Sequence, residues 1–144
     1  MLSIQDVIIQ NDFPVEHNQF YESFEPWRKE TEKTSGCKEG IYILKTESAV
    51  SRFLGVDHDG VLYIGKGDLL SPNHRIGKLI NSVNATERYH DGGGRCSDKV
   101  KSTFPLEKMR LHIALCENSR EKEKELLENY LEKFGELPPF NRQG

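Results

Sequence analysis

Residues 40–65 decide the fold, and they read GIYILKTESAVSRFLGVDHDGVLYIG. The stretch opens with β-branched and aromatic residues over 40–45, which favour a strand. Two further apolar runs, 53–57 and 61–65, flank the Asp59-Gly60 pair. An Asp-Gly pair between two apolar runs is a strong hairpin signal, so the spacing predicts an antiparallel sheet around this segment.

The segments that follow alternate helix and strand. Ser71-Pro72 is typical of a helix start, and apolar residues then recur at helical spacing, which predicts a helix over 72–84. Alternating residues predict a third strand over 109–116, and a charged helix follows over 119–134, where Gly135 ends it. This order predicts a small α+β domain, with a mainly antiparallel three-stranded sheet flanked by helices.

Residues 1–36 are interpreted as an N-terminal extension to a domain formed by residues 37–144. The apolar residues over 4–9 indicate a short strand or one turn of helix. A weak amphipathic helix over 18–32 is expected to be interrupted by Pro26, because proline removes a backbone donor. The total length of 144 residues fits one domain.

Composition excludes several classes of protein. The longest apolar runs are about four residues, against the ~20 that a membrane-spanning helix needs, so no membrane partner is expected. The N-terminus lacks the basic flank and apolar segment of an export signal, and the three cysteines are widely spaced. We therefore expect a cytoplasmic protein without a disulfide framework. Net charge is −3, but residues 65–110 hold nine Lys or Arg against five Asp or Glu, which makes a local positive surface possible.

Two triplets carry a more specific signal: Gly40-Ile41-Tyr42 on the first strand and Tyr63-Ile64-Gly65 on another. Arg75 on the next helix, a glutamate on the last helix and Asn141 after Pro-Pro-Phe continue the series. In this order, over residues 40–141, the chain resembles the GIY-YIG nuclease family. The resemblance implies a three-stranded antiparallel sheet flanked by helices. It also implies hydrolysis of nucleic-acid phosphodiester bonds, most simply in DNA, with one divalent metal ion, Mg²⁺ or Mn²⁺.

The resemblance also assigns roles, and the residue types suit phosphoryl transfer. Tyr42 or Tyr63 would be the base that activates water, although a tyrosine needs nearby cations to lower its pKa for this task. Lys66 follows as in the Tyr-Ile-Gly-Lys form of repair members and would polarise a hydroxyl or the water. Arg75 offers a planar fork to phosphate oxygens. Asn141 would support the site by hydrogen bonding, and the choice between the two tyrosines stays open.

Several glutamates of the last helix compete for the role of metal ligand. At about 100° per residue, Glu123 falls in the middle of the apolar face. A carboxylate there is costly unless a metal or a cation meets it, so Glu123 is the predicted ligand. The rival is Glu128, which lies nearer to Asn141, and the alternative for Glu123 is a frayed first turn. The same wheel places four acidic residues on the solvated face: Glu121, Glu125, Glu128 and Glu132.

The sequence departs from the family pattern in two places. Tyr42 and Tyr63 are 21 residues apart, about twice the commoner interval of the shorter members. Leu79 stands four residues after Arg75, where some restriction-type members have a histidine. His90 is the candidate replacement in the site, with His74 as a second choice. Three histidines have no expected catalytic role: His17, His58 and His112.

These features predict a metal-dependent DNA endonuclease. The alternative is an inactive nucleic-acid-binding or protein-binding module on the same fold, but every expected catalytic residue type is present. Little surface is left for reading bases, so we expect weak sequence preference, or specificity from a homodimer, a partner protein or the insertion at 46–60. Salt-sensitive DNA binding is expected through the cations Lys66, Arg75, Lys78, Arg88, Arg95, Lys99 and Lys101.

Overall fold

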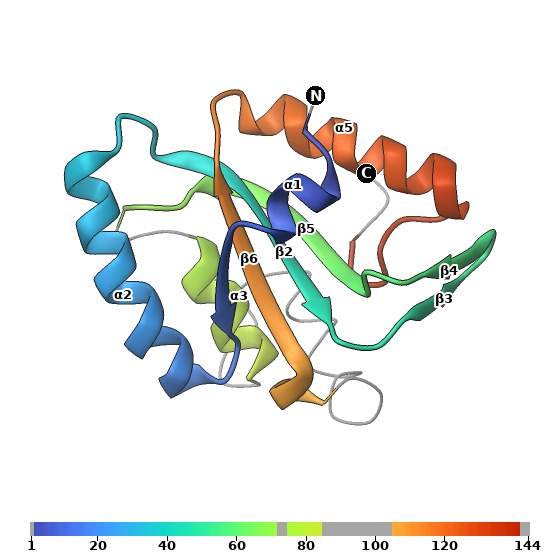
Figure 1. The fold of residues 1–144 in the computed structure, drawn as a ribbon, viewed down its shortest axis with the longest axis horizontal. Coiled ribbons are helices and arrows are strands. Elements are labelled where there is room, and N and C mark those ends of the chain that lie inside the picture. Colours follow the sequence, from blue (N-terminus) through green and yellow to red (C-terminus); the bar gives the residue numbers. More distant parts are fainter. Residues whose placement is uncertain (1, 72–74, 85–104, 142–144) are drawn as a thin grey trace.

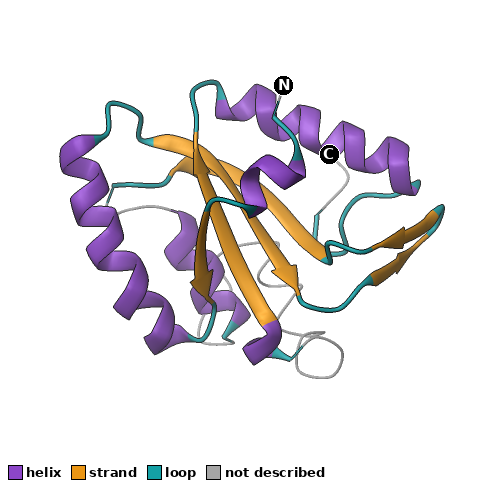
Figure 2. Cartoon of the chain, viewed as in Figure 1, coloured by secondary structure: helices purple, strands orange, loops and turns teal. Residues whose placement is uncertain are grey.

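The computed structural model describes residues 2–71, 75–84 and 105–141. Figures 1 and 2 show strands in the middle of the molecule with helices on both sides. The helices are α1 (Ile4–Ile8), α2 (His17–Thr34), α3 (Arg75–Val83), the short 3₁₀ helix η1 (Leu106–Lys108) and α5 (Ser119–Phe134). The strands are β1 (Asn11–Pro14), β2 (Glu39–Thr46), β3 (Val50–Arg52), β4 (Gly55–Asp57), β5 (Val61–Asp68) and β6 (Met109–Leu115).

The main sheet has four strands in the order β1-β6-β2-β5, and every neighbouring pair is antiparallel. This confirms an α+β fold with an antiparallel sheet. The predicted strand number of three is wrong, because β1 pairs with β6 at the outer edge. β1 belongs to residues 1–36, and its four residues gave too short a pattern to identify as a strand.

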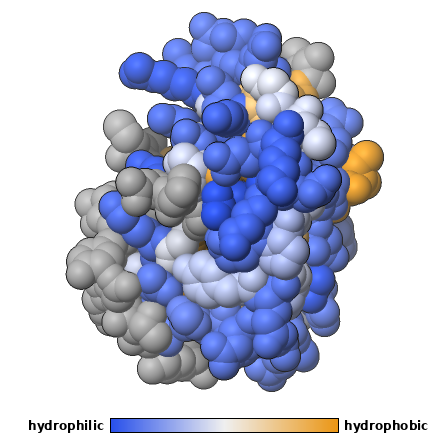
Figure 3. Space-filling model, turned by 90° about the vertical axis from the view of Figure 1, so that its left-hand side faces the viewer, coloured by the Kyte–Doolittle hydropathy of each residue, from blue (hydrophilic) through white to orange (hydrophobic). Residues whose placement is uncertain are grey.

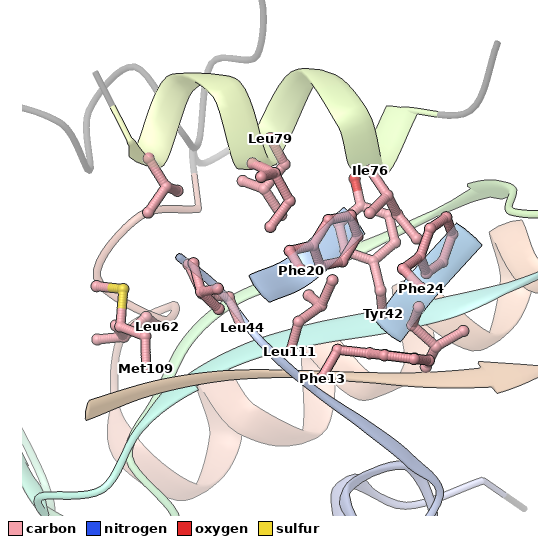
Figure 4. Packing of buried hydrophobic residues seen from close by; sticks show 14 of the residues in the cluster. Phe13, Phe20, Phe24, Tyr42, Leu44, Leu62, Ile76, Leu79, Met109 and Leu111 are labelled. Carbon is pink, nitrogen blue, oxygen red and sulfur yellow. The ribbon is translucent and has the colours of Figure 1, made fainter. Parts of the chain in front are cut away.

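Two apolar layers cover the two faces of the sheet. On one face, α2 and α3 pack on the strands through residues that include Phe20, Phe24, Ile76 and Leu79, and Figure 4 shows this cluster closing around Tyr42. On the other face, α1 and α5 pack through Val7, Leu126, Tyr130 and Phe134. Successive residues of β2 point to opposite faces, so Tyr42 and Leu44 join the first layer while Ile41 and Ile43 join the second.

The predicted hairpin between 53–57 and 61–65 is wrong. β4 pairs with β3 through a two-residue loop at Phe53 and Leu54, and β5 pairs with β2 instead. The reason is the buried Asp57 side chain, whose carboxylate accepts hydrogen bonds from the Val61 N–H and the Tyr130 hydroxyl at 3.0 and 2.8 Å. These bonds turn the chain from β4 into β5 without pairing the two strands.

Pro26 does not interrupt the N-terminal helix, contrary to the sequence-based expectation. α2 runs unbroken from His17 to Thr34 with Pro26 on its exposed side. The opposite side is held by the buried Phe20, Phe24 and Arg28. Tertiary packing therefore offsets the cost of one missing backbone hydrogen bond.

The segment over 4–9 forms a turn of helix, one of its two expected forms, and Ser3 and Asp6 close a capping box at its start. The third predicted strand and the last predicted helix are confirmed as β6 and α5. Within the described residues, no helix combines the length and the apolar character needed to cross a membrane.

Candidate active site

The two sequence triplets meet across a strand pair. Tyr42 of β2 lies opposite Gly65 of β5, and Leu44 lies opposite Tyr63. Residues directly opposite one another in an antiparallel pair share a face, so both tyrosines lie on the side of α2 and α3. Their ring centroids are 6.2 Å apart with an angle of 37° between the planes. Tyr42 is buried, whereas Tyr63 is partly exposed.

The glycines of the triplets make these close approaches possible. A Cβ atom added to Gly65 would lie only 2.6 Å from the Tyr42 hydroxyl oxygen and would also overlap the ring. A Cβ atom on Gly40 would lie 2.9 Å from the Cα atom of Leu115 in β6. Both positions therefore require glycine for packing, and at neither does the backbone φ demand it.

Two cations flank the edge strand β5 from opposite sides. Lys66 pairs with Ile41, whose side chain faces α5, so Lys66 lies on the α5 side of the sheet. Arg75 is the first residue of α3, on the other side. Its side chain passes Gly67, where an added Cβ atom would lie 3.9 Å from the Arg75 Cδ atom.

Glu123 completes the group from the first turns of α5. It is partly buried, and burial raises the pKa of its carboxyl while the positive charges of Lys66 and Arg75 oppose that rise. Burial also raises the pKa of Tyr42 well above its ordinary value, with Tyr63 adding to the rise, Arg75 opposing it and Glu123 adding to it. Around the edge of β5, Tyr42 is thus within electrostatic reach of Tyr63, Arg75 and Glu123, and Glu123 is within reach of Lys66 and Arg75.

The other glutamates of α5 lie elsewhere. Glu128 has an exposed side chain, 4.0 Å from the Lys124 ammonium group, on the solvent side of the helix. The prediction that Glu125 lies on the solvated face of this helix is wrong. Glu125 is partly buried, and its Oε1 atom has no hydrogen-bond partner among the described residues.

Asn141 holds the free edge of β5. Its side-chain amide accepts a hydrogen bond from the Ile64 N–H and donates one to the Ile64 carbonyl, both at 3.0 Å. The neighbouring Phe140 N–H donates to the Leu62 carbonyl at 2.9 Å. The C-terminal segment thus occupies the outward-facing backbone groups of an edge strand, in the stretch that contains Tyr63.

Two contacts near the site have no distinct sequence signal. Glu39, the first residue of β2, accepts a hydrogen bond at 2.8 Å from the backbone N–H of Ser119, the first residue of α5. Arg28 of α2 donates to the Leu70 carbonyl at 2.8 Å and forms ion pairs with Glu25 and Glu32. This second contact holds Leu70, two residues after β5 ends at Asp68. The only available cue for Glu39 is its place next to Gly40.

An open cleft of about 680 Å³ lies beside Lys66. It is bounded by the loop after α2, the end of β5 and the loop before α5. Figure 3 views the molecule from the end that carries α2, and hydrophilic residues dominate this face. The site is therefore adjacent to polar, solvent-accessible surface.

The residues present fit one hard divalent cation bound largely by water and substrate. No cluster of three or more His, Cys, Asp or Glu side chains suited to a metal occurs among the described residues. Glu123 offers one half-buried carboxylate, and Mg²⁺ is commonly held by one or two carboxylates together with water and phosphate oxygens. The donor set is thus compatible with a cation that binds along with a phosphodiester.

Several predicted residues lie outside the described part of the chain: His74, Arg88, His90, the glycines 92–94, Arg95, Lys99 and Lys101. Of the other histidines, His17 lies with its Nε2 atom 3.1 Å from the Asn81 side-chain oxygen. His112 is buried on the α5 side of the sheet. The chain matches no protein-family model, no curated protein and no solved structure.

Proposed function

We propose that the protein is an endonuclease of the GIY-YIG type that hydrolyses phosphodiester bonds in DNA with Mg²⁺ or Mn²⁺. The observation that carries the proposal is the position of Glu123. Its half-buried carboxylate shares one electrostatic environment with Lys66, Arg75 and the Tyr42 hydroxyl, although these residues come from four separate elements. Burying a carboxylate at a solvent-accessible edge is costly for stability and is typical of functional sites.

The proposed chemistry divides between binding and proton transfer. Lys66 and Arg75 approach β5 from its two faces, so a phosphodiester bound at this edge would meet positive charge from both sides. A tyrosine that has released its proton to solvent takes a proton from a water molecule as that water attacks phosphorus. One P–O ester bond breaks, and the leaving oxygen takes up a proton from solvent. Glu123 would hold the divalent cation, which when bound supplies positive charge for the leaving oxygen.

The two tyrosines differ in how they would take part. Burial keeps the Tyr42 hydroxyl protonated in the free protein, since its pKa is raised well above the ordinary value. It becomes a base only where cations such as Arg75 lower that pKa enough for the hydroxyl to lose its proton, whereas its hydrogen bond with Tyr63 favours the protonated form. Tyr63 is partly exposed, so its hydroxyl can meet a water molecule directly, but it too must lose its proton before it can act as the base.

The setting of the activity is also part of the proposal. We propose a cytoplasmic enzyme, in keeping with the free thiols of Cys37 and Cys116. Specificity would come from a second copy, a partner protein or the insertion at 46–60, which carries the β3–β4 hairpin. Cleavage sites mapped on a random-sequence library, together with the solution mass of the protein, test this part.

The direct test is cleavage of supercoiled plasmid with Mg²⁺ or Mn²⁺, with an EDTA control. We expect nicking by the wild type, loss of nicking in Glu123→Gln and retained nicking in Glu128→Gln. Glu128 is the matched control because it lies on the same helix with an exposed side chain. DNA binding without metal-dependent cleavage would instead identify an inactive binding module.

A further inference from the structure

Helix α5 has no N-terminal cap of its own. Its N-cap residue, Asn118, adopts the left-handed conformation with φ of 56° and makes no capping hydrogen bond with its side chain. A usual N-cap has an extended backbone and a side-chain oxygen that accepts from the first turn. At α5 this acceptor is the carboxylate of Glu39, which lies 80 positions away in the sequence and accepts from the Ser119 N–H at 2.8 Å.

Glu39 is itself firmly attached to the sheet. Its backbone carbonyl accepts from the Cys116 N–H at 3.0 Å, and it pairs with Asp68 across β2 and β5. It stands three residues before Tyr42 on the same strand. The carboxylate therefore connects the strand that carries Tyr42 to the start of the helix that carries Glu123.

The helical geometry makes this connection relevant to the site. Ser119 precedes Glu123 by four residues, which is about one helical turn and a rise of about 6 Å. Ser119 is buried, so the start of α5 lies in a packed environment. A shift of Ser119 relative to β2 would be passed to the Glu123 carboxylate with little loss, because one turn of helix is stiff.

The charges around Glu39 agree with this role. Hydrogen bonds from the Ser119 backbone and side chain hold the pKa of Glu39 below its ordinary value, with help from Lys122 and Lys66. An ionised carboxylate at a helix N-terminus interacts favourably with the helix dipole. Lys66 consequently lies in the field of two carboxylates, Glu39 and Glu123.

We propose that Glu39 is a positioning residue, which caps α5 from strand β2 and thereby sets the place of Glu123 relative to Tyr42 and Lys66. The claim that this placement serves catalysis rests on the proposed nuclease function. The claim that Glu39 positions the start of α5 is independent of that function. A displacement of about 1 Å in an active site can cost about 10²-fold in rate, so the effect is measurable.

The test compares Glu39→Ala, Glu39→Gln and the control Glu117→Ala. Glutamine keeps an oxygen that can accept from the Ser119 N–H, whereas alanine removes it. Glu117 lines the same cleft, so its substitution removes a similar charge and leaves the bond to Ser119 in place. Melting temperatures establish that each variant is folded.

Two readouts keep the two claims apart. Amide hydrogen exchange at Ser119 and the next residues reports the cap whether or not the protein cleaves DNA. The single-turnover rate at saturating DNA reports its effect on chemistry. In Glu39→Ala we expect faster exchange in the first turn and a rate about 10- to 100-fold lower. In Glu39→Gln we expect protection and most of the rate to return.

The inference is overturned if the first turn of α5 exchanges equally fast in Glu39→Ala and Glu117→Ala. It is overturned as well if Glu39→Gln loses as much exchange protection and as much of the single-turnover rate as Glu39→Ala. The catalytic part of the inference is overturned if Glu39→Ala shows faster first-turn exchange but keeps the wild-type single-turnover rate at saturating DNA. If the wild-type protein does not cleave DNA, only the nuclease proposal is refuted. The exchange data then still show whether Glu39 caps α5.

Discussion

The ring of Tyr42 lies against Gly65 of the neighbouring strand, so that the two triplets of the sequence form one cross-strand contact. A side chain at position 65 would displace the ring, because an added Cβ atom would lie 2.6 Å from the Tyr42 hydroxyl oxygen. Figure 4 shows why the ring has little room to move, since it is enclosed by the core residues around Phe24 and Ile76. The buried position of the Tyr42 ring therefore requires glycine at position 65.

Gly65→Ala should destabilise the fold by about 1–3 kcal/mol, the usual cost of overpacking a filled core. The matched control is Gly36→Ala, because nothing lies within 4 Å of a Cβ atom at that position. Chemical denaturation of both variants measures the difference. Equal stability of Gly65→Ala and the wild type would contradict the contact.

Glu123→Gln should raise the melting temperature at neutral pH while it abolishes cleavage. The pKa of Glu123 is raised in the folded protein, so ionisation costs stability as pH rises through that pKa, and glutamine does not ionise. Because the carboxylate is only half buried, water screens it and the gain should be small, about 1–2 °C. Thermal melts at pH 4 and pH 8 should show the gain only at the higher pH, and Glu128→Gln should show none.

Tyr42→Phe and Tyr63→Phe should both slow cleavage, and at least one by about 10²-fold or more, the scale of general-base loss. Tyr130→Phe is the control, because Tyr130 lies in the second half of α5 and its hydroxyl donates a hydrogen bond to Asp57. Loss of this hydroxyl should lower the stability of the protein without slowing the chemical step. Single-turnover rates at saturating DNA measure the effect. Wild-type rates in both site variants would refute the mechanism.

Asn141→Ala should destabilise the protein by about 1–3 kcal/mol, because it removes two hydrogen bonds to the Ile64 backbone. The Ile64 amide should then exchange faster with solvent. Cleavage should also fall, because the edge strand that carries Tyr63 loses its outer support. Asn129→Ala, on the exposed side of α5, should leave the Ile64 amide protected.

His112 should make the fold sensitive to acid. It is buried, and neither ring nitrogen has a hydrogen-bond partner within the described residues. Burial lowers its pKa, with Asp12 opposing the shift and Lys45 and Arg110 adding to it. The unfolded chain therefore takes up the proton first, and stability falls as pH drops below the ordinary histidine pKa of about 6.5.

The measurement for His112 is unfolding by denaturant at pH 7.5, 6.5 and 5.5. His112→Leu should remain folded, with a smaller loss of stability over this range than the wild type. An equal loss in both proteins would assign the acid sensitivity to other groups.

Much of the fold follows from local pattern. The strand around 40–45 and the alternation over 109–116 identify the two central strands. α5 ends where Gly135 adopts a left-handed φ of 77°, as glycine allows at a helix end. The order of the site residues is also local information, because each of Tyr42, Tyr63 and Arg75 sits at a motif position that can be read without any contact.

The tertiary structure decided the pairing of distant segments. The chain changes direction at Asp59-Gly60 as the sequence predicts, but β4 pairs with β3 and not with β5. The hydrogen bond from Tyr130 to the buried Asp57 stabilises this arrangement over the predicted hairpin. β1 joined β6 through backbone bonds that leave no trace in so short a sequence pattern. The cap of α5 by Glu39 and the hold of Asn141 on Ile64 span 80 and 77 positions. Helical and strand periodicity report only which face of an element is apolar, whereas such hydrogen bonds depend on which elements the whole core brings together.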